Sequence, residues 1–235
     1  MTDTTKAGAG VVTLSSVEEQ GPDAHELSAI LRREGHIRRF RRGQALFTEG
    51  DRAERVFLID RGWVMISCTS AEGREIVLGL RGSGDIIGEL STLDGEARSA
   101  TALAVADVDA IVAPGAVLTQ ALDQPAAARE LIGMLATRLR DADRKRLQFA
   151  TLDTLGRVAE RLVELAERFG QPTEDGVAVQ MPFSQEQLAS WCGASREATV
   201  KALAAMRSLK CISTGRQTLV VHDMAALTGH AQRRS

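Results

Sequence analysis

The sequence is poor in the residues that build metal sites and disulfide frameworks. It has 3 cysteines, Cys68, Cys192 and Cys211, and 4 histidines among its 235 residues. The cysteines are too few and too far apart for a disulfide framework or a CxxC metal knuckle. The histidines form no HxH or HExxH pair. We therefore expect reduced thiols and no metal site.

Long hydrophobic runs and a charge excess of one sign are missing as well. No stretch approaches the ~18 uncharged apolar residues of a membrane-spanning helix, and the opening MTDTTKAGAG lacks the pattern of a secretion signal. We expect a cytoplasmic protein with no membrane partner. Lys and Arg number 29 against 31 Asp and Glu, a net charge of −2, which excludes a uniformly basic coat for nucleic acid. Any nucleic-acid site must be a local basic patch.

What is present indicates two folded units. The 44% of hydrophobic residues are enough for a core, and the length suits one or two domains. Residues 1–24 are rich in Thr, Ala, Gly and Ser and are predicted to form a flexible tail. Short apolar runs separated by glycines follow from residue 37 to 114, which predicts a small all-β roll of seven or eight strands, with a β-sandwich as the alternative.

A long helix is predicted after the roll. Residues 126–149 contain no proline and carry a heptad seam about three repeats long. The seam favours a dimer axis, although an ordinary amphipathic helix packed on its own domain fits the same pattern. The seam positions are Ala128, Ile132, Leu135, Leu139, Ala142, Arg146 and Phe149.

The C-terminal part has the signature of a helix-turn-helix. Ser184 and Gln187 fit a capping box, so a helix is expected to start there and to end near Gly193. Ser195 then caps a second helix, residues 196–209, followed by a hairpin over residues 211–222 with Gly215–Arg216 at its tip. The predicted buried positions of the second helix are Val200, Leu203 and Met206.

The second helix carries the residues expected to read DNA. Arg196, Glu197 and Lys201 stand on its exposed side and suit a G·C-containing site in the major groove. Ser184, Ser195 and the free amides at both helix starts suit phosphates. Residues 184–222 hold five cations, Arg216 included, and two anions, a local charge of 5 − 2 = +3. A structural helical hairpin with a solvated charged face is the alternative.

The segment DIIGELSTLDGEARSAT, residues 85–101, contains the parts needed to hold a cyclic phosphodiester. Gly88 permits close backbone approach, Glu89 can accept from a ribose 2′-hydroxyl, and Arg98 supplies a guanidinium fork for the phosphate. Ser99 and Ala100 keep the wall small.

This segment closely resembles the phosphate-binding cassette of cyclic-nucleotide-binding domains. With the long helix and the SREATVK helix, residues 25–222 resemble the cyclic-AMP receptor protein/FNR (CRP/FNR) family of transcription regulators, which are not enzymes. The resemblance implies an α+β fold in three parts: a jelly-roll-like β-roll (residues 25–123), a dimerisation helix with hinge (124–151) and a winged helix-turn-helix (152–235). It also implies a homodimer that binds palindromic DNA with TGTGA-like half-sites and acts with RNA polymerase.

By the same resemblance, the ligand contacts fall on Gly88, Glu89, Leu90, Arg98 and Ser99 in the cassette and on Arg138 in the long helix. The base-reading positions fall on Arg196, Glu197 and Lys201.

The sequence departs from the family pattern at the purine end. The Thr–Ser pair that contacts adenine in the family is replaced by Ala142–Asp143, which leaves the choice of purine open. The resemblance favours cyclic AMP as the ligand, with cyclic GMP as the alternative. Asp143 would accept from the purine. No cysteine precedes Cys68 and residues 37–114 contain no histidine, which disfavours the iron–sulfur and haem branches. A ligand-independent family member and an architectural DNA-binding protein remain as further alternatives.

Overall fold

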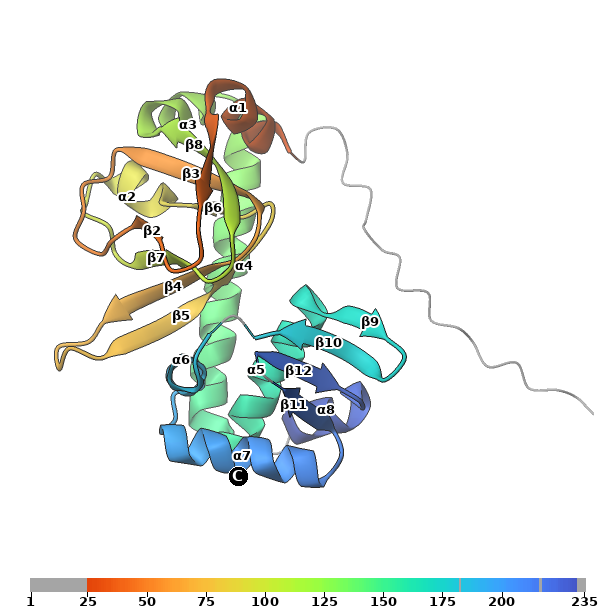
Figure 1. Ribbon diagram of the computed structural model, residues 1–235. Helices are drawn as coiled ribbons and strands as arrows, with labels where there is room; N and C mark the ends of the chain where they lie inside the picture. Colours follow the sequence, from red (N-terminus) through yellow and green to blue (C-terminus); the bar gives the residue numbers. More distant parts are fainter. Residues whose placement is uncertain (1–24, 182, 216, 232–235) are drawn as a thin grey trace, which may run out of the picture.

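The computed structural model describes residues 25–181, 183–215 and 217–231. The predicted tail, residues 1–24, and Arg216 at the hairpin tip lie outside the described residues. Figure 1 shows a β-rich unit and a smaller C-terminal unit joined by one long helix that runs along both. This arrangement is the α+β fold expected from the sequence.

The N-terminal unit is a roll of two four-stranded sheets, as predicted. The sheet orders are β1-β8-β3-β6 and β2-β7-β4-β5, all antiparallel. Two clusters of buried aliphatic and aromatic side chains fill it, with Leu58 and Ile59 fully buried at its centre. The strands are His36–Phe40, Ala45–Phe47, Arg55–Arg61, Val64–Thr69, Glu75–Arg81, Ile86–Ile87, Thr101–Ala104 and Val108–Pro114 (β1 to β8).

Three short helices accompany the roll. Helix α1 (Glu26–Glu34) buries Leu27 and Leu31 against the same cluster as the long helix. Helix α2 (Glu89–Asp94) follows β6 directly, and α3 (Gly115–Ala121) follows β8. Helix α2 begins inside the predicted cassette, so the last strand residues and the first helix residues together set its geometry.

The long helix α4 covers Pro125–Thr151, slightly more than the predicted range. Its 27 residues span about 40 Å at 1.5 Å per residue. Ala127 and Leu131 pack on the roll, whereas the seam residues Ile132 and Leu139 are 66% and 62% exposed. One helix face is therefore covered by its own chain, and the predicted seam is covered only in part, since its residue Leu135 packs against the roll cluster while Ile132 and Leu139 do not.

The C-terminal unit begins after a break at Leu152–Asp153, where the chain leaves helical geometry and the Asp153 side chain accepts from the Gly156 amide. It contains α5 (Thr154–Phe169), α6 (Gln185–Trp191), α7 (Arg196–Ser208) and α8 (Met224–Ala231). Its sheet has the order β11-β12-β10-β9. These strands are Gln171–Thr173, Gly176–Gln180, Ile212–Gly215 and Thr218–Val221 (β9 to β12).

The local signals of the helix-turn-helix are confirmed. Ser184 and Gln187 form the reciprocal capping box at the start of α6, and the Ser195 hydroxyl accepts from the Ala198 amide at the start of α7. The hairpin expected over residues 211–222 is present as β11 and β12. Strands β9 and β10 and helix α8 were not predicted, because the segment around Gly176 was interpreted as a loop only.

The two units pack against each other through α6 and β5. The Ser190 hydroxyl accepts from the Val77 amide at 3.0 Å and donates to the Glu75 carbonyl at 2.8 Å. Met65 and Val77 of the roll share a core cluster with Trp191 of α6. The C-terminal unit is therefore docked on the roll by hydrogen bonds between the Ser190 side chain and the main chain of β5, and by an apolar contact.

The turn of the helix-turn-helix is tied to the end of α4. Gly193 has φ +58°, and a Cβ there would overlap the ring of Phe149. Arg157 donates from Nε to the Cys192 carbonyl at 2.9 Å and from Nη1 to the Leu152 carbonyl at 2.8 Å. The Arg157 guanidinium thus connects the break after α4 with the turn before α7.

We expect Gly193→Ala to lower the free energy of unfolding by about 2 to 3 kcal/mol, because a left-handed alanine costs about 1 to 2 kcal/mol and the new methyl must also displace Phe149. Gly73→Ala is the matched control, since Gly73 has φ +77° with open space around its Cβ position. Urea unfolding of both variants measures the difference. An equal loss of unfolding free energy in the two variants would mean that overlap with Phe149 adds nothing to the cost of Gly193→Ala.

Candidate ligand and nucleic-acid sites

Gly88 stands at the junction of β6 and α2 and has a left-handed backbone, φ +80°. A Cβ on Gly88 would lie 2.7 Å from Arg98 Nη1 and 3.2 Å from the Arg55 carbonyl oxygen. Only glycine fits both the backbone angle and the close approach. The backbone of the cassette is thereby brought against the guanidinium predicted to hold the phosphate.

Arg98 is buried, with 4% of its surface exposed. Its Nη1 donates to the Gly88 carbonyl at 2.6 Å, its Nη2 donates to the Arg55 carbonyl, and the guanidinium lies 4.5 Å from the Phe47 ring centroid. Burial lowers the pKa of Arg98, while Glu89 and Asp51 oppose that shift. Within the described residues its Nε is buried without a hydrogen-bond partner. A desolvated guanidinium with an unused donor suits an anionic ligand.

Glu89 is the other buried charge of the cassette, 3% exposed. Its carboxylate accepts from Arg138 Nη1 of α4 at 2.6 Å, and Arg138 Nη2 donates to the Ile86 carbonyl at 2.6 Å. The structure therefore brings together Gly88, Glu89 and Arg98, which are close in sequence, with Arg138, which is 49 residues from Glu89. Glu89 and Arg98 are bonded to other groups and not to each other.

The remaining predicted ligand residues lie at the edge of this site or away from it. Leu90 is 48% exposed on α2, and Ser99 is exposed beside Arg98. Asp143 has a 62% exposed side chain and pairs with Arg146 at 3.5 Å. Five residues separate Arg138 from Asp143, about 140° around the helix, so Asp143 faces away from the cassette of its own chain.

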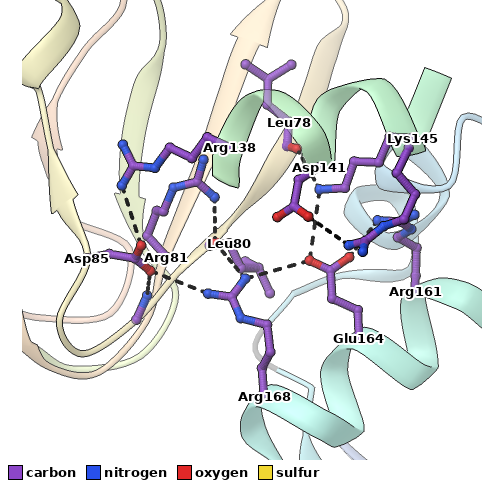
Figure 2. Close-up of polar contacts among 12 residues, drawn as sticks. Leu78, Leu80, Arg81, Asp85, Arg138, Asp141, Lys145, Arg161, Glu164 and Arg168 are labelled. Carbon is purple, nitrogen blue, oxygen red and sulfur yellow. Dashed lines mark hydrogen bonds and ion pairs between the residues drawn. The ribbon is translucent and has the colours of Figure 1, made fainter. Parts of the chain in front are cut away.

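A row of charged groups connects the cassette with the C-terminal unit (Figure 2). Arg138 contacts Asp85 Oδ1 at 3.4 Å, and Arg168 of α5 contacts Asp85 Oδ2 at the same distance. Arg168 also lies 3.7 Å from Glu164. The pairing of Asp85 with Arg168 could not be predicted from the sequence, because no spacing pattern signals an ion pair between residues 83 positions apart.

Lys145 is a mostly buried cation at this junction. It lies 3.4 Å from the Leu78 carbonyl, 3.9 Å from Glu164 and 5.8 Å from the Trp191 ring. Burial lowers its pKa from 10.5 to about 8, an effect that Glu164 and Asp141 oppose and that Arg161 and Arg81 reinforce. The protonated amine is thus disfavoured in the docked structure.

This shift predicts that stability rises with pH. Between pH 8 and 10.5 the unfolded chain binds the Lys145 proton more tightly than the folded chain, so the free energy of unfolding increases across that window. From pH 7.5 to 9 we expect wild type to gain about 1 kcal/mol relative to Lys145→Met. Urea unfolding of both proteins at each pH gives this difference and cancels other titrations, such as that of Cys192, whose pKa burial raises to about 12. Parallel pH profiles would contradict it.

The predicted DNA-reading residues lie together on α7. Arg196, Glu197 and Lys201 are exposed, and α7 crosses the end of the molecule farthest from the roll in Figure 1. Ser184 and Ser195 are exposed at the two helix starts. No described part of the chain covers these three predicted base-reading side chains.

One predicted core position of α7 is wrong. Val200 is 37% exposed, and the buried stripe is Thr199, Ala202, Leu203 and Met206 instead. Thr199 is fully buried because its hydroxyl donates to the Ser195 carbonyl at 3.0 Å, which satisfies the polar group and leaves the methyl to pack.

Neither metal ligation nor membrane insertion has a basis in the described residues. They contain no group of three or more His, Cys, Asp or Glu side chains suited to a metal ion. Among the described helices, none combines the length and the apolar character needed to cross a membrane.

Two families match the chain in the same order as the two units. The cyclic nucleotide-binding domain family matches residues 37–125, and the Crp-like helix-turn-helix domain family matches residues 156–229. A CRP-like cAMP-activated global transcriptional regulator of Mycobacterium tuberculosis is 32% identical over 194 residues, which cover 82% of this chain and 87% of the relative. The chain belongs to the CRP/FNR family of DNA-binding transcription regulators.

Other family members show how widely the fold is shared. A global nitrogen regulator of Synechococcus elongatus is 29% identical, covering 82% of this chain and 88% of that protein. The structure of FixK2 from Bradyrhizobium japonicum has a TM-score of 0.75 at 21% identity, covering 86% of this chain and 99% of that one. The CRP/FNR architecture predicted from the sequence is therefore confirmed, and the family consists of regulators rather than enzymes.

Proposed function

We propose that this CRP/FNR protein is a cytoplasmic homodimer that binds palindromic DNA when a cyclic nucleotide occupies its roll, with cyclic AMP preferred to cyclic GMP. The observation that carries the proposal is the cassette itself. Arg98 is buried beside Gly88 with an unused Nε donor, and Glu89 is buried beside it as a carboxylate acceptor. A cyclic phosphodiester presents an anion to the first and a ribose hydroxyl to the second.

The ligand acts in this proposal through Arg138. Arg138 already pairs with Glu89, so a ribose hydroxyl on Glu89 must share the carboxylate with α4. The same guanidinium contacts Asp85, which contacts Arg168 of α5. A ligand that binds more tightly to one arrangement of these charged groups than to another shifts the position of the C-terminal unit. The free energy of coupling between ligand binding and this shift is about 1 to 3 kcal/mol. Residues 149–153 form the proposed hinge.

The dimer is proposed to form along the α4 seam. Ile132, Leu139 and Phe149 are apolar yet 66%, 62% and 49% exposed in the single chain, which a second copy of the seam would cover. A dimer places two α7 helices in successive major grooves ~34 Å apart. It also gives Asp143 a role, because a residue that faces away from its own cassette is free to contact the purine held by the partner.

We expect Leu139→Glu to convert the dimer to a monomer, since the carboxylate would be buried in the seam. Sedimentation equilibrium of wild type and variant measures this, with Leu147→Glu as a control at an exposed leucine of α4 outside the seam. A wild-type monomer, or a Leu139→Glu dimer, would rule out the seam.

The ligand is tested by calorimetric titration of the wild-type protein with cyclic AMP and with cyclic GMP. Saturable binding of cyclic AMP, tighter than that of cyclic GMP, is the expected result. A second candidate, a family member that works without ligand, is favoured by the 2.6 Å Glu89–Arg138 pair that already occupies the carboxylate. Binding of neither nucleotide would support that candidate. In both cases RNA polymerase is the proposed protein partner.

A further inference from the structure

A polar cavity of about 1140 Å³ separates α4 from α5. Thr137 and Asp141 line it, and each stands two residues, about 200° around the helix, from the seam residue Leu139. The cavity therefore opens on the side of α4 opposite to the proposed dimer seam. It is distinct from the cassette, since neither Gly88 nor Arg98 lines it.

Three guanidinium groups from three different parts of the fold meet at the inner end of this cavity (Figure 2). They are Arg81 of β5, Arg138 of α4 and Arg168 of α5. Arg81 Nη1 and Arg168 Nη1 donate to the same Leu80 carbonyl, at 2.8 Å and 3.3 Å. Arg138 and Arg168 share the two oxygens of Asp85.

Carboxylates pair with two of these three cations. Glu89 pairs with Arg138 at 2.6 Å, Asp85 contacts both Arg138 and Arg168, and Glu164 lies 3.7 Å from Arg168 while it is engaged by Arg161 at 2.6 Å. Within the described residues, no carboxylate lies within 4.0 Å of an Arg81 nitrogen. Burial lowers the pKa of Arg81, and the neighbouring Arg138 and Arg168 lower it further, against the opposing effect of Asp85 and Glu89.

Unused hydrogen-bond donors also indicate an anion site. Arg138 Nε is buried without a partner among the described residues. The only hydrogen bond of the Arg81 guanidinium within them goes to a carbonyl. An unpaired, desolvated guanidinium is costly, and a bound oxyanion with several acceptors would relieve that cost.

We propose that this end of the cavity binds a small oxyanion with two or more negative charges, of the phosphate-ester or pyrophosphate class, held by Arg81, Arg138 and Arg168. The planar forks of arginine match phosphate oxygens in pairs. Among the described residues that line the cavity none is aromatic, so the site recognises the anionic group and not a nucleobase. Glu160 and Glu167 line the α5 wall and exclude long polyanions such as nucleic acid.

The position of the three arginines gives this anion a regulatory effect. One comes from the roll, one from the long helix and one from the C-terminal unit, so a shared anion fastens all three in the docked arrangement. Arg138 belongs to both sites, because it also pairs with Glu89. Anion binding and cassette occupancy are therefore coupled, and each changes the affinity of the other by the same factor.

The test is calorimetric titration of the full-length protein with inorganic pyrophosphate at constant ionic strength, without cyclic nucleotide. We expect saturable binding that Arg81→Gln and Arg168→Gln each weaken by about tenfold or more, as the loss of one charge-assisted contact requires. Arg129→Gln is the matched control, since Arg129 lines the same cavity nine residues, or about 13 Å, along α4 from Arg138. It should leave the affinity within about twofold.

Arg98→Ala separates this site from the cassette. Pyrophosphate binding that survives Arg98→Ala supports the cavity site even if neither cyclic nucleotide binds the wild type. Loss of pyrophosphate binding in Arg98→Ala alone would place the anion in the cassette and overturn the proposal. Equal weakening by Arg129→Gln and Arg81→Gln, or no saturation of the wild type by about 1 mM pyrophosphate, would overturn it as well.

Discussion

Replacing Arg98 with alanine is expected to weaken cyclic-nucleotide binding by about 100-fold. The substitution removes the buried guanidinium with its unused Nε donor, and hydrogen bonds to charged groups are worth about 1.5 to 3 kcal/mol each. Calorimetric titration with cyclic AMP measures the loss. Wild-type affinity in the variant would show that the ligand, if bound, does not lie against Arg98.

Two further variants separate the causes of that loss. Arg98→Lys keeps the positive charge but lacks the planar fork, so it should recover only part of the affinity. Arg98→Ala also strips the Gly88 and Arg55 carbonyls of their donor, which is expected to lower stability. Glu89→Gln tests the other end of the ligand while leaving Arg98 in place. A urea unfolding curve for each variant shows whether enough folded protein is present in the titration.

The second large expected effect is a loss of DNA affinity when Arg196 is replaced. Arg196→Ala should cost about 1 to 3 kcal/mol on a palindrome of TGTGA half-sites and little on random DNA, because a bidentate contact to guanine is lost only where guanine is present. Arg207→Ala is the control on the same helix, since Arg207 donates to Thr214 Oγ1 of the hairpin at 2.9 Å. Electrophoretic mobility shifts at fixed salt give both affinities.

The pattern of losses decides between two kinds of protein. A sequence-specific regulator loses affinity for the palindrome and keeps its weak affinity for random DNA. An architectural protein that coats or bends DNA loses both equally, because its arginines contact phosphates only. Lys201 adds a second check, since Lys201→Arg replaces a point charge by a fork and should sharpen discrimination at one base pair.

The sequence predicts best what depends on neighbouring residues. The capping box at Ser184 and the cap at Ser195 depend on groups only three residues apart in the chain, and both are present as expected. The same holds for Gly88, whose left-handed backbone needs no partner far along the chain. The order of roll, long helix and helix-turn-helix followed from such local signals.

Contacts between the roll and the C-terminal unit could not be predicted from the sequence. The Asp85–Arg168 pair exists only because α5 lies beside the loop before β6, and periodicity in neither segment indicates that placement. The prediction that Val200 is buried was wrong for a different reason. Hydrophobicity favoured Val200 over Thr199 as the core residue, but the Ser195 carbonyl accepts from the Thr199 hydroxyl, so Thr199 can be buried. Strand β9 was missed because a three-residue strand with proline gives almost no alternation to detect. Strand β10 was missed because it begins at Gly176, the last residue of the segment interpreted as a loop.

The hydrogen bonds between Ser190 and strand β5 have a consequence for how this protein tolerates change. Both partners of the hydroxyl are peptide groups, which every residue except proline supplies in full. Substitutions at positions 75 and 77, other than proline at 77, therefore leave that attachment intact, whereas replacement of Ser190 by a residue without a hydroxyl removes it. Natural variation that changes how firmly the C-terminal unit is held should accordingly gather on α6 and spare β5.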